Sequence, residues 1–381
     1  RKPSRKKKET ENMQIHKGLD GVVVDTTAVS LVDGANGQLS YRGYPIDALL
    51  ERPFAEVASL VAAGGFDCGF GCSFGRALTQ VSALSPREEA MVLELPAEVH
   101  PMHVLQGLSP LLDRGDPADG FDDAFGRFGD AAQGFIVAAK LPSLVATHFR
   151  RRSVADLAAA DPIEQFLLQI DAPTSPIARR AFETAQILQL EHGFNAGTFT
   201  ARVVASTLAP VENALSAAFG ALHGVLHGGA DQAALETADR VGSPEKASGF
   251  VDDCLANREK VMGMGHREYK VVDPRARHLK TLAEQLTRGS EHEQTYRTLE
   301  AIEARFAVRM AEQGKALHAN VEFYKGLVFR TLGLPPRFFT ALFAMARVFG
   351  YLAHFIESRE DNRIVRPQAK YVGPPVSADA A

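Results

Sequence analysis

Cysteine is scarce in this chain. The 381 residues include only three cysteines, Cys68, Cys72 and Cys254. So few, in an odd number, do not make a disulfide framework and are typical of a reducing compartment. We therefore expect a cytoplasmic protein. Cys68 and Cys72 flank a Gly/Phe-rich stretch that we interpret as an irregular loop, and the sequence has no second cysteine pair to complete a zinc site.

The common nucleotide-binding motifs are also missing. The sequence contains neither a G-x-G-x-x-G motif after a predicted strand nor a P-loop. This argues against dinucleotide and nucleoside-triphosphate chemistry.

Positive charge is sparse outside the first eight residues. Six of those eight are Lys or Arg, and without them the chain has 36 basic against 46 acidic residues. A body of that charge is a poor nucleic-acid binder. We interpret residues 1–16 as a disordered, solvated basic tail, with a nuclear or phosphate-seeking signal as the alternative. The tail lacks the apolar region of a secretory signal, and Glu9 and Glu11 do not suit a transit peptide.

One apolar run, from Phe338 to Ile356, imitates a membrane-spanning helix. Arg347 and His354 lie inside it, and an arginine in mid-bilayer is costly. A helix that is apolar on all sides is also what a large soluble core or a dimer interface requires. We predict a buried helix rather than a membrane span, with Arg347 retained for a ligand.

Sustained strand alternation is absent, and the expected architecture is mainly α-helical with a small β element at the N-terminus. Turn signals at 33–34 and 36–37 lie between residues 21–24 and 38–41, which we read as strands of hairpins. From about residue 48 the pattern is helical. Asp273-Pro274 predicts a capped helix start, and a helix from about Val321 ends at Gly333. The length allows a large core and two domains.

Two histidines beside glycines and one carboxylate carry the chemical signal. His223 and His227 are four apart, as metal ligands on a helix can be, but Gly224 stands where a zinc protease needs glutamate. His227, before two glycines, more plausibly directs its ring at a ligand. His266 lies in a glycine-broken loop that leads to Arg275, in the first turn of a helix and suited to anion capture.

Glu322 has two readings. An acidic residue at a helix start is favoured by the helix dipole, by about 0.3–1 kcal/mol. With two histidines on other segments it could instead complete an acid–base site. The three residues together predict an enzyme.

The segments that carry these residues resemble those of a known protein family. The segments 226–230 (LHGGA), 265–276 (GHREYKVVDPRA) and 320–324 (NVEFY) are similar to the signature segments of citrate synthases and 2-methylcitrate synthases. Further similarity occurs at 18–22, 41–44, 191–202, 343–350 and 366–373, in the family's order. The resemblance covers nearly the whole chain from about residue 17 and is weakest between 63 and 87.

The resemblance implies a fold and a reaction. The family is a mostly helical homodimer, so the chain would have a large domain, 17–227 and 326–381, and a small mobile domain, 228–325. Glycines near 228, 263 and 265 are candidate bending sites. The reaction is a Claisen-type condensation of acetyl-CoA with oxaloacetate, followed by thioester hydrolysis, with no metal or redox cofactor.

The resemblance also implies roles for individual residues. Glu322 would be the base, His227 would donate a hydrogen bond to the thioester oxygen, and His266 would polarise and protonate the oxaloacetate carbonyl. Oxaloacetate carboxylates would be bound by His192, Arg275 and Arg347, and by Arg366 of the other subunit. The CoA adenine would contact the loop residues Lys260, Met262, Gly263 and Met264. Lys270 would bind the CoA phosphates.

Several positions depart from the family pattern. Glu322 replaces the more usual aspartate, and Asp231 and Glu268 add negative charge near an anionic substrate pair. His223, in place of Lys or a small residue, is expected either to support the residues that contact substrate or to be a packing residue. Three hypotheses remain: a citrate synthase, a 2-methylcitrate synthase that uses propionyl-CoA, and a non-catalytic paralogue that binds dicarboxylate or acyl-CoA. One methylene changes discrimination by only about 1–3 kcal/mol, so the sequence does not decide between the first two.

Overall fold

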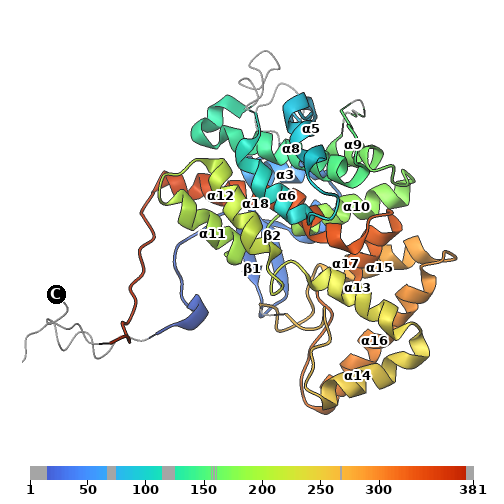
Figure 1. Cartoon of the computed structure of the whole chain (residues 1–381). Coiled ribbons are helices and arrows are strands. Elements are labelled where there is room, and N and C mark those ends of the chain that lie inside the picture. Colours follow the sequence, from blue (N-terminus) through green and yellow to red (C-terminus); the bar gives the residue numbers. More distant parts are fainter. Residues whose placement is uncertain are drawn as a thin grey trace, which may run out of the picture.

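The chain folds into a mainly α-helical structure with a small sheet at its N-terminal end (Figure 1). The computed structural model describes residues 15–66, 74–113 and 125–374, apart from 156, 158, 160 and 267. Most of the predicted basic tail lies outside the described residues, as do Cys68 and Cys72. Within them, the mainly α prediction with a minor β element is confirmed.

The helices follow one another through most of the chain. The α-helices are α2 Ile46–Leu49, α3 Phe54–Ala63, α4 Phe74–Gln80, α5 Pro86–Glu94, α6 Pro101–Leu108, α8 Ala132–Arg150, α9 Pro162–Gln169, α10 Pro176–Gln189, α11 Ala196–Ala205, α12 Val211–His223, α13 Ala230–Val241, α14 Ala247–Ala256, α15 Ala276–Thr287, α16 Glu293–Glu312, α17 Glu322–Thr331 and α18 Phe339–Glu360. Short 3-10 helices are η1 Lys17–Leu19, η2 Ser109–Leu111, η4 Gly126–Ala131, η5 Pro244–Lys246 and η6 Pro336–Phe338.

The sheet has three antiparallel strands in the order β1 Ser30–Asp33, β2 Gln38–Tyr41 and β3 Tyr44–Pro45. In the first turn, the Asp33 carboxylate accepts hydrogen bonds from the backbone N–H groups of Ala35 and Asn36. The predicted hairpin therefore exists, but its first strand was wrongly placed at 21–24. That segment has no strand partner and exposes its valines, so the pairing begins at residue 30 instead.

Sequence signals define several helix starts. Ser85 and Glu88 form a capping box at α5, and Asn195 caps α11 with its side-chain oxygen. The predicted start at Asp273-Pro274 is two residues early, since α15 begins at Ala276. The Asp273 carboxylate does accept the backbone N–H of Arg275, at 3.0 Å, but it is shared with other partners described below.

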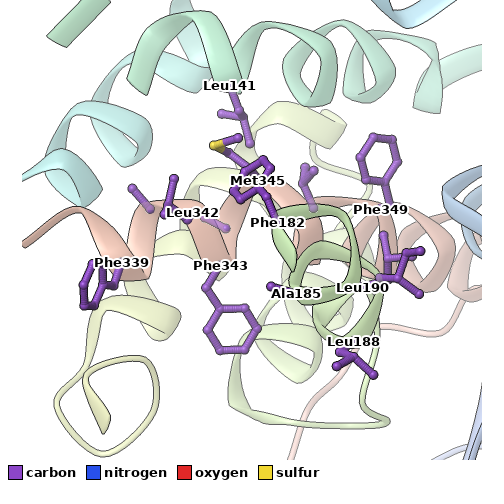
Figure 2. Packing of buried hydrophobic residues seen from close by; sticks show 14 of the residues in the cluster. Leu141, Phe182, Ala185, Leu188, Leu190, Phe339, Leu342, Phe343, Met345 and Phe349 are labelled. Carbon is purple, nitrogen blue, oxygen red and sulfur yellow. The ribbon is translucent and has the colours of Figure 1, made fainter. Parts of the chain in front are cut away.

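The apolar helix α18 lies in the interior. Although it is long and apolar enough to span a membrane, 94% of its most apolar window is buried. Met345 lies beside Leu141 of α8 and Phe182 of α10, and Phe349 is on the same side of α18, whereas Phe343 points to the opposite side of the helix (Figure 2). Full burial of each such side chain contributes about 1.5–3 kcal/mol. The prediction of a buried helix is confirmed.

Helices α13, α14, α15 and α16 gather on one side of the molecule, and the elements before and after them build the larger bundle around α18 (Figure 1). Helix α17 packs against α13 and α15 and also against α10 of the bundle. This grouping resembles the expected division at 228–325; that these helices move as a unit stays a prediction. The loops that carry the predicted site residues lie where the two groups meet.

Candidate active site

Three segments from distant parts of the sequence converge at this junction. His227 lies in the turn between α12 and α13, His266 in the loop between α14 and α15, and Glu322 is the first residue of α17. The Glu322 carboxylate acts electrostatically on the rings of both histidines. The structure therefore brings the three predicted catalytic residues together.

A short antiparallel bridge fixes the His266 loop beside the start of α17. Gly265 donates its N–H to the His318 carbonyl at 2.8 Å, and the Asn320 N–H bonds the Gly263 carbonyl at 2.9 Å. Gly263 has φ +79°, and a Cβ there would lie 2.7 Å from the Phe323 ring. Because only glycine fits both this backbone and this space, the approach of the two segments depends on residue 263.

The contacts of His266 define its tautomer. Its Nδ1 accepts hydrogen bonds from the backbone N–H groups of Glu268 at 3.0 Å and Tyr269 at 3.2 Å. Burial, followed by the nearby Arg275 guanidinium, lowers the pKa of His266, so the ring is neutral at pH 7. A neutral ring whose Nδ1 accepts must carry its proton on Nε2. The Nε2 atom lies 3.3 Å from the Arg275 Nη2, which can only donate, so the Nε2–H must turn away from this contact to reach a ligand.

Asp273 and Arg275 form a buried clasp. The Arg275 Nε and Nη2 donate to the two carboxylate oxygens of Asp273, at 3.0 and 2.9 Å. The second oxygen also accepts the Val321 N–H at 3.2 Å. Charge-assisted bidentate pairs of this kind fix orientation as well as adding energy. The clasp ties the guanidinium to the segment that carries Glu322.

His192 and Arg347 join the site from the larger bundle. The His192 Nε2 lies 3.1 Å from the Tyr269 hydroxyl. Burial, then the charges of Arg275 and Arg347, hold the pKa of His192 well below its usual value. Arg347 is 1% exposed on α18, and its Nε donates to the Gln189 carbonyl at 2.6 Å. Two guanidinium groups thus lie close enough to the His192 imidazole to act on it, a grouping that suits a small molecule with more than one carboxylate.

The His227 ring is neutral and held at one nitrogen. Burial, followed by the Arg347 charge, lowers the pKa of His227 to about 4. Its Nδ1 lies 3.3 Å from the Ala221 carbonyl, which can only accept, so Nδ1 is the donor. The neutral ring then has no proton on Nε2. Donation to a ligand requires Nδ1 to leave Ala221 by a rotation of the ring.

Glu322 presents a carboxylate that the described residues do not engage. Its backbone N–H bonds the Asn320 side-chain oxygen at 3.1 Å. The carboxylate itself has neither a hydrogen bond nor an ion pair to a described side chain, although it influences His227, His266 and Arg275. A half-buried carboxylate beside neutral imidazoles is available to accept a proton from a ligand.

Sequence reasoning missed a buried charge directly beneath Glu322. Lys325, one turn further along α17, is fully buried and lies 3.3 Å from the Asp231 carboxylate. The sequence predicts that Asp231 adds negative charge near the substrates; the Lys325 ammonium lies beside that carboxylate, and the effect on substrate affinity stays a prediction. A lysine inside the otherwise apolar run 323–329 was the available signal.

Other predicted residues lie at the edge of the site or away from it. Arg366 belongs to the exposed C-terminal segment, which extends away from the body (Figure 1), and it does not reach this site within one chain. Lys260 and Lys270 are exposed on the His266 loop. Met262 and Met264 are partly buried there, and Gly263 is committed to the bridge.

His223 is a packing residue, as expected. Its ring stacks on that of His100 with centroids 4.4 Å apart and contacts His103 edge-on at 4.8 Å. Among the described residues no group of His, Cys, Asp or Glu has the geometry of a metal site.

The fold and the site together define a mainly helical enzyme in which candidate acid–base groups lie beside buried guanidinium groups. Residues 18–368 match the family profile described as the citrate synthase C-terminal domain. A citrate synthase of Mycolicibacterium smegmatis is 36% identical, over 96% of this chain and 97% of that protein. A 2-methylcitrate synthase of Corynebacterium glutamicum is 33% identical, over 94% and 95%.

Solved structures of citrate synthases have the same fold as this chain. Citrate synthase from Thermotoga maritima superposes with a TM-score of 0.81 at 31% identity, covering 96% of this chain and 97% of that one. A ternary complex of the Thermoplasma acidophilum citrate synthase with carboxymethyl coenzyme A and oxaloacetate gives 0.86 at 26% identity, over 97% and 98%. The chain belongs to the citrate synthase family, whose members are transferase-type enzymes.

Proposed function

We propose that this protein is a citrate synthase that condenses acetyl-CoA with oxaloacetate and hydrolyses the resulting thioester to citrate and CoA. The supporting observation is the meeting of one unengaged carboxylate, Glu322, with two neutral imidazoles, His227 and His266, between buried guanidinium groups. Removing a proton from a thioester methyl group is far uphill, so the enol oxygen must be stabilised by donors already in place.

Oxaloacetate would be bound first through its two carboxylates. Arg275 and Arg347 are buried, so their charges act in a medium of low dielectric where charge-assisted hydrogen bonds are strong. The clasp to Asp273 leaves the Nη1 side of Arg275 for a ligand. His192 supplies a neutral polar contact. The ketone oxygen would then accept a hydrogen bond from the Nε2–H of His266.

The chemical steps follow from these positions. Glu322 takes a proton from the acetyl methyl group, while His227, rotated from Ala221, donates to the thioester oxygen. The enol carbon attacks the ketone carbon, and the ketone oxygen takes the His266 Nε2 proton as the carbon–carbon bond forms. Water then cleaves the thioester, its hydroxyl joining the acyl carbon and its proton the CoA sulfur, and the proton held by Glu322 returns through solvent to His266. None of these steps calls for a metal or redox cofactor.

Coenzyme A would lie along the His266 loop. Lys260 and Lys270 are exposed cations on this loop and suit phosphate groups, while the backbone around Met262, Gly263 and Met264 would contact the adenine. Residues 260–270 lie between α14 and α15 and pair with the segment before α17, so closure around acyl-CoA would carry these contacts toward Glu322 and exclude water.

A second copy of the chain would complete the site as a homodimer. The segment that carries Arg366 is exposed throughout, and its Ile364 and Tyr371 side chains are 61% and 73% exposed. An extended segment with exposed apolar side chains is suited to cover a partner surface. Arg366 would bind an oxaloacetate carboxylate in the neighbouring subunit. We place this soluble dimer in the cytoplasm.

A 2-methylcitrate synthase is the second candidate, since relatives of that name are 33% identical over nearly the full length. The two activities differ by one methylene in the acyl group. A hydrophobic pocket distinguishes such substrates by only about 10- to 200-fold.

Release of free thiol from acetyl-CoA and from propionyl-CoA, with and without oxaloacetate, tests the proposal. We expect oxaloacetate-dependent release with a higher kcat/KM for acetyl-CoA. A clear preference for propionyl-CoA would establish the second candidate. Binding of oxaloacetate without thiol release from either substrate would instead identify a non-catalytic paralogue.

A further inference from the structure

We propose that Asp231 and Lys325 are a positioning pair that holds Glu322 against the His227 turn and sets the charge beneath the reacting groups. This inference rests on the proposed function. Neither residue is assigned a contact with a substrate, and both side chains are fully buried.

Every contact of the Lys325 ammonium is internal. Its Nζ lies 3.3 Å from the Asp231 Oδ2, donates to the Gln189 side-chain oxygen at 2.9 Å, and sits 4.3 Å from the centre of the Phe343 ring. Gln189 also accepts the Nε of Arg347 at its backbone carbonyl. The ammonium is therefore held by three elements besides its own.

These contacts join the segments that carry the site. Lys325 is one helical turn from Glu322 on α17, Asp231 is the second residue of α13 just after the His227 turn, and Gln189 ends α10 before His192. A side chain that ties three such segments fixes their separation. Residues three apart on a helix lie on the same face, so movement of Lys325 is transmitted to Glu322.

Stability alone does not account for the pair. Burying two opposite charges costs several kcal/mol per ion, and replacing such a pair with neutral residues is often neutral or stabilising. By resemblance, members of the family have asparagine at the position of Asp231. The aspartate of this chain therefore adds a buried negative charge, which Lys325 neutralises. The pair lies beneath the one position where the base is longer than the family's aspartate.

The charge of Lys325 also reaches His227. The groups that face this ring are Arg347 from α18 and Glu322 and Lys325 from α17, the two cations lowering and the carboxylate raising the pKa of His227. Loss of the ammonium should let His227 protonate more readily. A residue that only packs the core would not have this effect.

The experiment compares Lys325→Met, Asp231→Asn and the double variant with wild type. Arg330→Met is the matched control, because Arg330 and Asp239 form an ion pair between the same two helices, α17 and α13, at an exposed place away from the site. The double variant leaves neither an unpaired aspartate nor an unpaired lysine at this place, so it should fold even where a single variant does not. Thiol release gives kcat and KM, and NMR of ¹³C-labelled histidine follows the titration of His227.

We expect kcat to fall about 10- to 100-fold in Lys325→Met and in the double variant, the scale of a base displaced by about 1 Å, while KM for oxaloacetate changes much less. The His227 signal should titrate at higher pH in both. Arg330→Met should change neither quantity. The proposal is overturned if Lys325→Met and the double variant match Arg330→Met in kcat and in the His227 titration.

The two proposals fail separately. If wild type releases no thiol from either acyl-CoA, the proposed function falls, and the NMR titration alone decides whether Lys325 governs His227. If wild type turns over and the variants behave as the control, only the positioning pair is refuted.

Discussion

For Glu322, the proposed base, the position of the carboxylate matters as much as the residue type. Its carboxylate lies at the start of α17 and influences both His227 and His266, while its backbone N–H is tied to Asn320. The glutamate is one methylene longer than the aspartate usual in the family. The structure fixes the backbone at the start of α17 and makes no direct contact with the longer side chain's carboxylate among the described residues.

We expect Glu322→Gln to bind oxaloacetate within a few-fold of wild type but to lose turnover by about 10²- to 10⁴-fold, the usual contribution of a general base. The amide keeps the shape of the side chain and loses only its basicity. Calorimetry measures the binding and thiol release the turnover. Glu236→Gln, on the exposed face of α13, is the control, and unchanged turnover in Glu322→Gln would mean that another group is the base.

At the scale of single elements, α6 shows how a helix cap couples stability to pH. His100 precedes the helix, and its Nδ1 accepts the Met102 N–H at 3.2 Å. Burial, followed by the neighbouring His223 and His103, lowers the pKa of His100 to about 4. The cap therefore works only while the ring is neutral.

This predicts a specific pH effect. The pKa of His100 falls from 6.5 in the unfolded chain to about 4 in the folded one, so the unfolded chain binds more protons between those values and stability decreases as pH falls through that window. His100→Asn keeps a good cap but cannot titrate. Its Tm should drop less between pH 7 and pH 5 than that of wild type, by roughly 2 °C, measured by thermal unfolding.

His16→Asn is the control for this measurement, because His16 is exposed. An equal drop in Tm for His100→Asn and wild type would show that His100 is not a source of acid sensitivity.

At the scale of the whole molecule, the proposed dimer would complete each site with a residue from the second copy. Arg366 lies on a segment that extends from the end of α18 and does not return to its own site (Figure 1). If a second copy supplies it, two defective chains can complement each other. A heterodimer of Glu322→Gln and Arg366→Leu chains, purified through two different tags, then contains one intact site.

We expect this heterodimer to recover roughly half of the wild-type turnover per dimer, because each C2 dimer has two equivalent sites, whereas either homodimeric variant has little. The measurement is thiol release from the tagged heterodimer. Equal loss in the heterodimer and in both homodimers would place Arg366 in its own subunit's site, and a monomer in sedimentation would refute the dimer.

Local rules account for what the sequence determined alone. Helical periodicity, turn residues and caps act over a few neighbours, so the mainly α architecture, the buried helix α18 and the hairpin at 33–37 could be predicted. The segments 226–230, 265–276 and 320–324 pointed to His227, His266 and Glu322 because glycines and a charged residue at a helix start are visible in the chain itself.

Only the tertiary structure decided which distant residues share one space. The first strand was misplaced at 21–24 because strand pairing depends on a partner. The tautomer of His266 depends on two backbone N–H groups, and the pairing of Lys325 with Asp231 joins residues on different helices. The effect of a buried charge depends on the partner that tertiary packing places beside it. The residues next to it in the sequence do not specify that partner.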